Sequence, residues 1–208
     1  LVIPTLTTKY SERDESMTQK YAWYLSKSVE EIPGNAAAFF PSYSYMEDVK
    51  DQLKMHTDRR IFVEKPQMDK EEKQKTLDRF KDRKDEGDAV LLGVTAGSFG
   101  EGIDFPGEIL KAVFIIGLPL QRPDLETKDL INFLDEKYGK GWEYGYTYPA
   151  INRAVQAAGR CIRSKTDEGA IIFMDKRYNW SNYRKTLPKD ISLKETRAPW
   201  KELGEFFN

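Results

Sequence analysis

Two arginines and a glutamine in the C-terminal third of the sequence could bind phosphate. In the stretch QAAGRCIRS, residues 156–164, the apolar pattern predicts a helix. At ~3.6 residues per turn, Gln156, Arg160 and Arg163 share one face of that helix. The face carries no acid, so the two guanidinium groups repel each other unless an anion lies between them, and a planar guanidinium fits phosphate oxygens. Helices also turn charged residues to water, and the residues alone leave both interpretations open.

A glycine-rich segment is a second candidate for anion binding. TAGSFGEGIDFPGE, residues 95–108, directly follows an apolar run. Its glycines, among them Gly102, permit a backbone whose amides can turn toward an anion. Asp104 adds a carboxylate that could accept a hydrogen bond from a ribose hydroxyl or hold an arginine. By itself, a glycine-rich turn after a strand is more often structural.

The apolar pattern predicts the elements that must position these side chains. Nearly continuous apolar runs, typical of buried parallel strands, lie at 36–40, 60–64, 89–94, 111–118 and 169–174. Amphipathic stretches between them predict helices at roughly 12–31, 44–55, 69–86, 125–138 and 150–164. This alternation predicts an α/β domain of three layers, with helices on both faces of a mainly parallel sheet. Ligands of such domains bind at the carboxyl ends of the strands. The connection 139–149 shows no regular pattern.

Composition limits the possible functions. The chain has 208 residues, of which 39% are hydrophobic and 32% charged, which is typical of one soluble globular domain. One cysteine, Cys161, and one histidine, His56, exclude a disulfide framework, a zinc site with the usual ligands and an iron–sulfur cluster held by this chain. We expect Cys161 to be a small core residue. The net charge of −1 argues against a broad DNA-coating surface but permits a narrow basic groove.

Three motifs in order resemble the second motor lobe of superfamily 2 helicases, and the XPD family in particular. Gln-x-x-Gly-Arg-x-x-Arg at 156–163 resembles motif VI, EGIDF within 95–108 resembles motif V, and AAAFFPSYSYMEDV at 36–49 resembles motif IV. TTKYSERDE near the start and MDKRY at 174–178 extend the similarity over nearly the whole chain. The resemblance implies a RecA-like, P-loop NTPase-like fold for a single domain, 1–208. A DinG-like helicase, suggested by SFGEGIDFPGE, is the nearest alternative.

The resemblance also implies roles for individual residues. Arg160 and Arg163 would be arginine fingers that reach the γ-phosphate of ATP held by the other lobe, where such a residue can be worth ~10³–10⁵ in rate. Gln156, Gly102 and Asp104 would lie beside this nucleotide. Single-stranded DNA would cross the same lobe and contact Ser42, Tyr43, Thr95, Trp142 and Arg177.

Three observations bear on these DNA contacts. Ser44 and Glu47 form an S-x-x-E pattern that predicts a capping box, and the free amides at a helix start attract phosphate. Trp142 lies among other aromatic residues, which can stack on bases for ~1–3 kcal/mol each, although loop aromatics also commonly pack against their own domain. Many XPD sequences carry Arg and Lys where this chain has Ala96 and Ser98, which puts side-chain contacts to DNA from that loop in doubt.

The sequence lacks a P-loop and an acidic box for Mg²⁺, which a helicase motor needs. We therefore expect the second lobe of a longer, ATP-dependent 5′-to-3′ DNA helicase of the XPD type, with a role in nucleotide excision repair and no activity as an isolated fragment. ATP and Mg²⁺ would be bound mainly by the first lobe, which in this family also carries a 4Fe-4S cluster and an arch insertion. We expect no metal in this chain.

The expected partners are single-stranded DNA and the N-terminal lobe of the same protein. We expect a monomer, no membrane contact, and a cytoplasmic location, or a nuclear one in a eukaryote. A module that binds single-stranded nucleic acid without catalysis remains an alternative. A nucleotide-binding oxidoreductase fits poorly, because no G-x-G-x-x-G follows the first strand.

Overall fold

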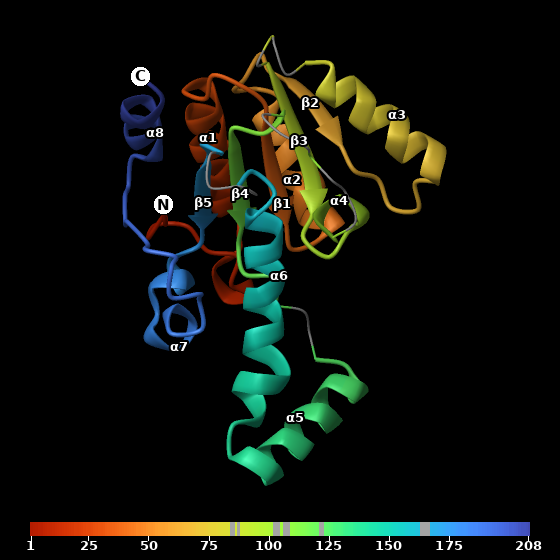
Figure 1. Ribbon diagram of the computed structural model, residues 1–208, viewed down its shortest axis with the longest axis vertical. Helices are drawn as coiled ribbons and strands as arrows, with labels where there is room; N and C mark the ends of the chain where they lie inside the picture. Colours follow the sequence, from red (N-terminus) through yellow and green to blue (C-terminus); the bar gives the residue numbers. More distant parts are fainter. Residues whose placement is uncertain (84–85, 87, 102–104, 106–108, 121–122, 163–166) are drawn as a thin grey trace.

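A single parallel sheet organises the protein. The computed structural model describes residues 1–208 except 84–85, 87, 102–104, 106–108, 121–122 and 163–166 (Figure 1). The sheet has five strands in the order β2-β3-β1-β4-β5, and all neighbouring pairs are parallel. The strands are β1 (Ala36–Phe40), β2 (Arg60–Val63), β3 (Ala89–Val94), β4 (Ala112–Ile116) and β5 (Ala170–Met174). Each predicted strand is present, which confirms the α/β fold class.

Helices cover both faces of the sheet. The α-helices are α1 (Glu15–Glu30), α2 (Tyr43–Leu53), α3 (Lys70–Lys81), α4 (Ser98–Glu101), α5 (Leu125–Tyr138), α6 (Tyr148–Ala158), α7 (Ser181–Arg184) and α8 (Pro199–Phe207). Apolar side chains of α1, α2 and α8 form one core with the sheet, and those of α3, α4, α6 and α7 form the other. The three central strands are fully buried because both of their faces are covered. These two cores give the three predicted layers.

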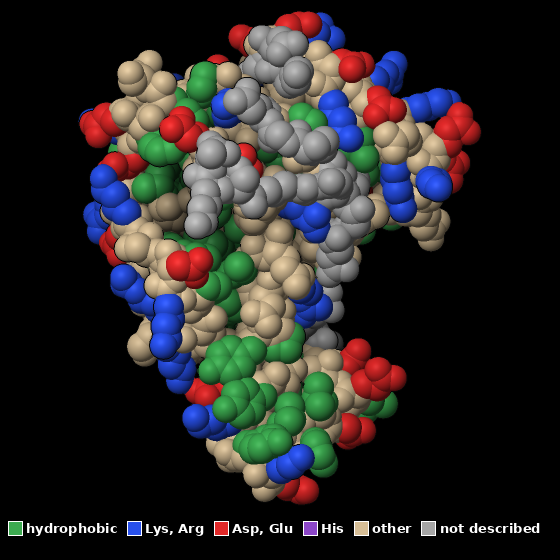
Figure 2. Space-filling model, in the orientation of Figure 1, with side chains coloured by type: hydrophobic (Ala, Val, Ile, Leu, Met, Phe, Trp, Pro, Cys, Tyr) green, Lys and Arg blue, Asp and Glu red, His purple; other side chains and the backbone are tan. Residues whose placement is uncertain are grey.

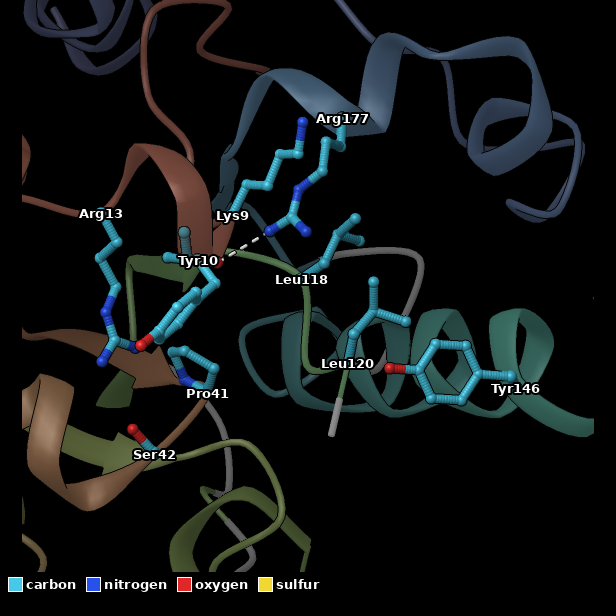
Figure 3. Close-up of a pocket in the computed structure, with 10 residues that line it drawn as sticks. Lys9, Tyr10, Arg13, Pro41, Ser42, Leu118, Leu120, Tyr146 and Arg177 are labelled. Atoms are coloured by element: carbon cyan, nitrogen blue, oxygen red, sulfur yellow. Dashed lines mark hydrogen bonds between the residues drawn. The ribbon is translucent and has the colours of Figure 1, made fainter. Parts of the chain in front are cut away.

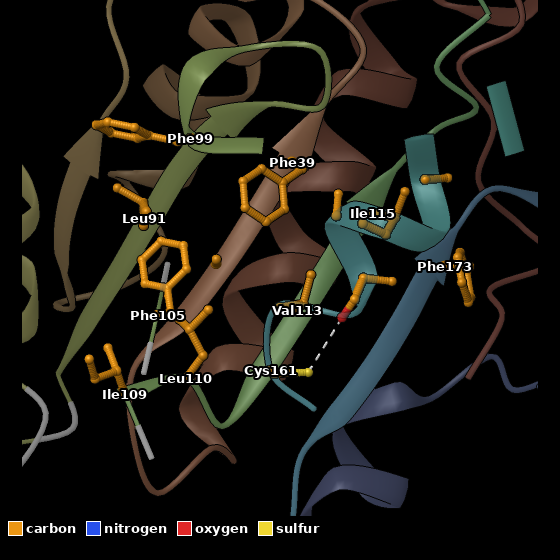
Figure 4. Close-up of a cluster of buried hydrophobic side chains, with 14 of the residues drawn as sticks. Phe39, Leu91, Phe99, Phe105, Ile109, Leu110, Val113, Ile115, Cys161 and Phe173 are labelled. Carbon is orange, nitrogen blue, oxygen red and sulfur yellow. Dashed lines mark hydrogen bonds between the residues drawn. The ribbon is translucent and has the colours of Figure 1, made fainter. Parts of the chain in front are cut away.

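Cys161 belongs to the second of these cores. Its side chain is buried beside Val113 and the neighbouring strand residues (Figure 4). Burial raises the pKa of the Cys161 thiol to about 12. The prediction of a core cysteine is therefore confirmed.

The start of α2 differs from the prediction. Ser42, not Ser44, is the N-cap, because Ser42 has an extended backbone and its Oγ accepts a hydrogen bond from the Tyr45 amide at 3.3 Å. A helix that begins at Tyr43 buries Tyr45 and Met46 on the sheet. The predicted capping box of Ser44 is therefore wrong.

The connection 139–149 is largely helical, contrary to the prediction. Helix α5 ends at Tyr138, its C-cap Gly139 has a left-handed backbone, and the π-helix η3 (Glu143–Thr147) then continues into α6. A β-carbon on Gly141 would lie 2.0 Å from the Ile131 carbonyl oxygen of α5. The glycines thus permit close helix packing. In Figure 1, α5, η3 and α6 form a helical hairpin, residues 125–158, that projects from the sheet.

Helix α6 is also shorter than predicted. It ends at Ala158, where Gly159 is the C-cap, so Arg160 lies in the turn after the helix. The single helical stripe predicted for Gln156 and Arg160 is therefore wrong: only Gln156 lies on α6. In the described part of the chain, no helix is long and apolar enough to cross a membrane.

Candidate functional site

The carboxyl ends of β1 and β3 are joined by the segment that follows β3. Thr95 donates two hydrogen bonds to the carbonyl oxygen of Phe40, from its amide at 2.8 Å and from its hydroxyl at 3.1 Å. The Thr95 side chain is buried, at 2% exposure. These contacts give Thr95 a structural role, and its predicted DNA contact stays a prediction.

Glu64, which the sequence analysis did not select, organises the same segment. It is fully buried at the end of β2. Its carboxylate accepts hydrogen bonds from the Val94 amide at 2.9 Å, the Ser98 hydroxyl at 2.9 Å and the Phe99 amide at 3.4 Å. A β-carbon on Gly97 would lie 2.6 Å from either Glu64 oxygen. Ser98 therefore points into the domain, and the only signal in the sequence was an acid directly after an apolar run.

Glu64 also contacts the start of α2. The Tyr43 hydroxyl donates a hydrogen bond to Glu64 Oε1 at 3.0 Å. Burial, together with the Glu64 carboxylate, raises the pKa of Tyr43 to about 12, so that the phenol keeps its proton near neutral pH. Tyr43 is half-buried, and its predicted contact with DNA stays a prediction.

Arg160 also contacts the segment after β3, at a different residue from those that bind Glu64. Its Nη2 donates a hydrogen bond to the carbonyl oxygen of Gly100 at 2.9 Å. Two segments selected from the sequence, 95–108 and 156–164, are thus in direct contact. Gln156 lies exposed in the last turn of α6. Arg163, Gly102 and Asp104 lie outside the described residues.

A groove of about 770 Å³ runs along the carboxyl edge of the sheet, past the ends of β1, β4 and β5. We call it the basic groove, and it is lined by Thr8, Lys9, Tyr10, Arg13, Pro41, Ser42, Leu118, Leu120, Tyr146 and Arg177. Figure 3 shows Arg13 and Tyr10 near Ser42 at one end, and Tyr146 of the helical hairpin at the other. Lys9, Arg13 and Arg177 line the groove, and the charges of Lys9 and Arg13, which are not held in a buried ion pair, can attract a polyanion.

The cations of the basic groove differ in their surroundings. Lys9 pairs with Glu12 at 3.7 Å, and the Arg13 guanidinium lies 4.7 Å from the centre of the Tyr45 ring. The Tyr10 ring beside them is 92% exposed. The sequence analysis named the segment TTKYSERDE only as part of the family resemblance and selected none of Lys9, Tyr10 and Arg13, because scattered bases give no chemical pattern by themselves.

Arg177 is nearly buried, and its guanidinium is held by hydrogen bonds within the domain. It is 7% exposed and donates from Nε to Asp175 Oδ1 at 2.9 Å and from Nη2 to Asp175 Oδ2 at 2.8 Å. Nη2 also donates to the Thr8 hydroxyl at 2.8 Å. Burial acts to lower the pKa of Arg177, but the hydrogen bonds with Asp175 raise it overall. Arg177 lines the groove, but its guanidinium is already paired with Asp175. Its predicted contact with DNA stays a prediction.

Trp142 lies on the surface of the helical hairpin. Its ring is 55% exposed and packs against Tyr146, with the ring centres 4.6 Å apart. Since Tyr146 lines the basic groove, this aromatic pair extends from the groove onto the hairpin. Figure 2 shows apolar side chains gathered over the same hairpin. Stacking of a base on Trp142 stays a prediction.

The sequence matches a family model described as helicase C-terminal domain over residues 25–194. The chain is 33% identical to the general transcription and DNA repair factor IIH helicase subunit XPD of Dictyostelium discoideum, over 90% of this chain and 25% of that protein. It is 28% identical to the ATP-dependent DNA helicase chl-1 of Caenorhabditis elegans, over 88% of this chain and 23% of that protein. The chain thus spans about a quarter of the length of these curated relatives.

Solved structures agree with this match. A structure titled XPD_APO superposes with a TM-score of 0.74 at 26% identity, over 94% of this chain and 39% of that one. Domain 2 of the DEAD-box helicase Mss116p, solved bound to an RNA duplex, superposes with a TM-score of 0.58 at 17% identity, over 93% of this chain and 61% of that one. The second likeness shows the fold alone.

Proposed function

The chain belongs to the helicase C-terminal domain family, as a lobe of the XPD type, and from this premise we propose that it is the second motor lobe of an ATP-dependent 5′-to-3′ DNA helicase. The observation that carries the proposal is the hydrogen bond from Arg160 to the Gly100 carbonyl oxygen. It holds a guanidinium beside α4, the helix that follows the carboxyl end of β3, and ligands of α/β domains bind at the carboxyl ends of the strands. The cellular role that we propose is nucleotide excision repair.

In this proposal, Arg160 and Arg163 act on ATP that the first lobe of the same protein binds. Positive charge stabilises the transferred phosphoryl group, whose negative charge spreads over its oxygens in the transition state. Gln156, Gly102 and Asp104 lie beside the nucleotide. ATP draws the two lobes together because the arginines gain an anionic partner, and hydrolysis lets the lobes part.

The basic groove is the part of the track that this lobe offers to single-stranded DNA. Lys9 and Arg13 neutralise phosphates, and the exposed Tyr10 ring offers a face on which a base can stack. Ser42 contributes its hydroxyl, and Trp142 with Tyr146 extends the aromatic surface onto the hairpin. Ser42 lies two residues after Phe40, whose carbonyl oxygen accepts both hydrogen bonds from Thr95 of the segment after β3, so lobe movement can be converted into steps along the DNA strand.

Mg²⁺ and the iron–sulfur cluster are assigned to the first lobe. Within the described ranges of this chain, no group of three or more His, Cys, Asp or Glu side chains could hold a metal ion. We therefore give neither group a ligand from this lobe. We propose that the protein is a monomer. We also propose that it is cytoplasmic, or nuclear in a eukaryote, because that is where its DNA lies.

The test is the ATP turnover of the full-length helicase with Arg160→Ala and Arg163→Ala. Each change should leave ATP binding mostly intact and lower the rate of hydrolysis in the presence of DNA by ~10³-fold or more. Arg79→Ala, which removes an exposed arginine from α3, is the control and should keep the normal rate. Normal hydrolysis in both finger variants would refute the assignment and favour a lobe that binds nucleic acid without catalysis.

A further inference from the structure

We propose that Glu64 is the positioning residue that couples the nucleotide side of this lobe to its DNA side. The inference rests on the proposed function, since it concerns how the two sites that function requires communicate. In this proposal Glu64 touches neither ATP nor DNA, and it acts through the residues that it binds.

Glu64 joins three elements through one carboxylate. Its donors are the Tyr43 hydroxyl at the start of α2, the Val94 amide at the end of β3, and the Ser98 hydroxyl at the start of α4. The Phe99 amide is a fourth donor, at 3.4 Å. In the described part of the chain, these partners are neutral hydroxyl and amide groups, so the buried charge is stabilised by hydrogen bonds whose directions fix the geometry.

A continuous path then links Arg160 to Tyr43. The Arg160 guanidinium holds the Gly100 carbonyl oxygen, Gly100 lies in α4, and the first two residues of α4 donate to Glu64. Glu64 in turn accepts from Tyr43 at 3.0 Å. A displacement of Arg160 toward a phosphate therefore moves α4, and α4 moves the carboxylate against Tyr43.

The path has little room to absorb such a displacement. A β-carbon on Gly100 would lie 2.4 Å from the Thr95 carbonyl oxygen, and one on Gly97 would lie 2.6 Å from the Glu64 oxygens. Closely packed groups transmit a shift because they cannot be compressed. Tyr43 follows Ser42, which lines the basic groove, so the far end of the path lies beside the proposed DNA track.

The same contacts would exist if Glu64 only stabilised the fold. The two roles differ in one measurable quantity, the coupling between ATP and DNA binding. This coupling is the ratio of the dissociation constants for single-stranded DNA without and with a non-hydrolysable ATP analogue. A loss of stability alone lowers the melting temperature and leaves the ratio unchanged.

The experiment measures this ratio for labelled oligo-dT in the full-length helicase and in Glu64→Gln, Tyr43→Phe and the double variant. Glu64→Gln keeps the shape of the side chain but turns an NH₂ group toward a donor. Glu64→Gln should change the ratio of the two dissociation constants toward one, by about fivefold or more. Tyr43→Phe should act in the same direction, and the double variant should add nothing further. Leu77→Ala is the control: it leaves a cavity in the core at α3, so it should lower the melting temperature and keep the ratio.

Each outcome is decisive. A wild-type ratio in both Glu64→Gln and Tyr43→Phe, whatever their melting temperatures, would refute the coupling role and leave the proposed function intact. Independent, additive effects of the two changes would equally refute a path through Glu64. A ratio of one in the wild-type helicase, or no binding of DNA, would instead refute the proposed function and the inference together.

Discussion

Arg177 and Asp175 form a bidentate pair in which the carboxylate is fully buried and the guanidinium lines the basic groove. Asp175 also accepts a hydrogen bond from the Thr8 amide at 2.9 Å. The pair therefore fastens the N-terminal segment, which carries Lys9 and Tyr10, to the end of β5. A groove assembled from segments far apart in sequence depends on such an anchor.

We predict that Asp175→Ala destabilises the protein strongly. The change leaves the Arg177 charge buried without its partner, and breaking a buried ion pair in this way costs about 3–5 kcal/mol. Urea unfolding of the 208-residue chain measures this loss of the free energy of unfolding. Asp51→Asn, at an exposed ion pair with Lys54, is the control and should cost no more than about 1 kcal/mol. A cost for Asp175→Ala as small as the control's would show that the pair does not anchor the segment.

We predict that Arg13→Ala weakens the binding of single-stranded DNA equally for every base sequence. A lysine or arginine that neutralises one phosphate contributes about 0.7 to the slope of the logarithm of the binding constant against the logarithm of the salt concentration. Titration of the full-length helicase with labelled DNA at several salt concentrations should show that decrease in slope. Lys75→Ala, on the exposed face of α3, should leave the slope unchanged. An unchanged slope for Arg13→Ala would remove this residue from the track.

The strands were predictable because their signal is local. AAAFF and AVLLGV are continuous apolar runs, as expected for parallel strands that are buried on both faces. The hairpin was not predictable in the same way. Its glycines favoured an irregular segment, whereas Gly141 in fact permits close contact with the Ile131 carbonyl oxygen of α5, and no local pattern in the sequence marks that contact.

The candidate site was predictable only in part, for the same reason. The contact between Arg160 and Gly100 joins two segments that the sequence had already marked. Glu64 has no partner at a recognisable spacing, since its donors come from α2, β3 and α4. Helix α6 ends before Arg160, with Gly159 as its C-cap. This boundary was not predicted, because the apolar pattern continues to Ile162.

We predict that Gly97→Ala destabilises the protein by about 1–3 kcal/mol, the usual cost of overpacking. The new methyl group would lie 2.6 Å from both oxygens of Glu64, which four hydrogen bonds hold in place. Urea unfolding of the 208-residue chain measures the change. Gly159→Ala is the matched control: its φ is −66° and the nearest atom is 3.5 Å away, so it should be neutral or stabilise by about 0.4–1 kcal/mol. Equal effects of the two changes would mean that the Glu64 carboxylate moves aside freely.

We predict that Cys161 lowers the stability of the protein at alkaline pH. Burial raises the pKa of its thiol to about 12, whereas a cysteine in an unfolded chain titrates near 8.5. Below about pH 8.5 both states keep the proton, and the thiol contributes nothing to the pH dependence. Between about 8.5 and 12 only the unfolded state releases its proton, so the free energy of unfolding falls, by about 2 kcal/mol at pH 10.

Cys161→Ala isolates this effect, because Cys161 is the only cysteine in the chain. Urea unfolding at pH 8 and at pH 10 should show a loss of stability that is about 2 kcal/mol smaller in the variant than in the wild type. The comparison uses only the difference between the two pH values, so the cavity left by the substitution cancels. The tyrosines titrate alike in both proteins and cancel in the same way. An equal loss in the two proteins would mean that the thiol ionises as readily in the folded core as in the unfolded chain.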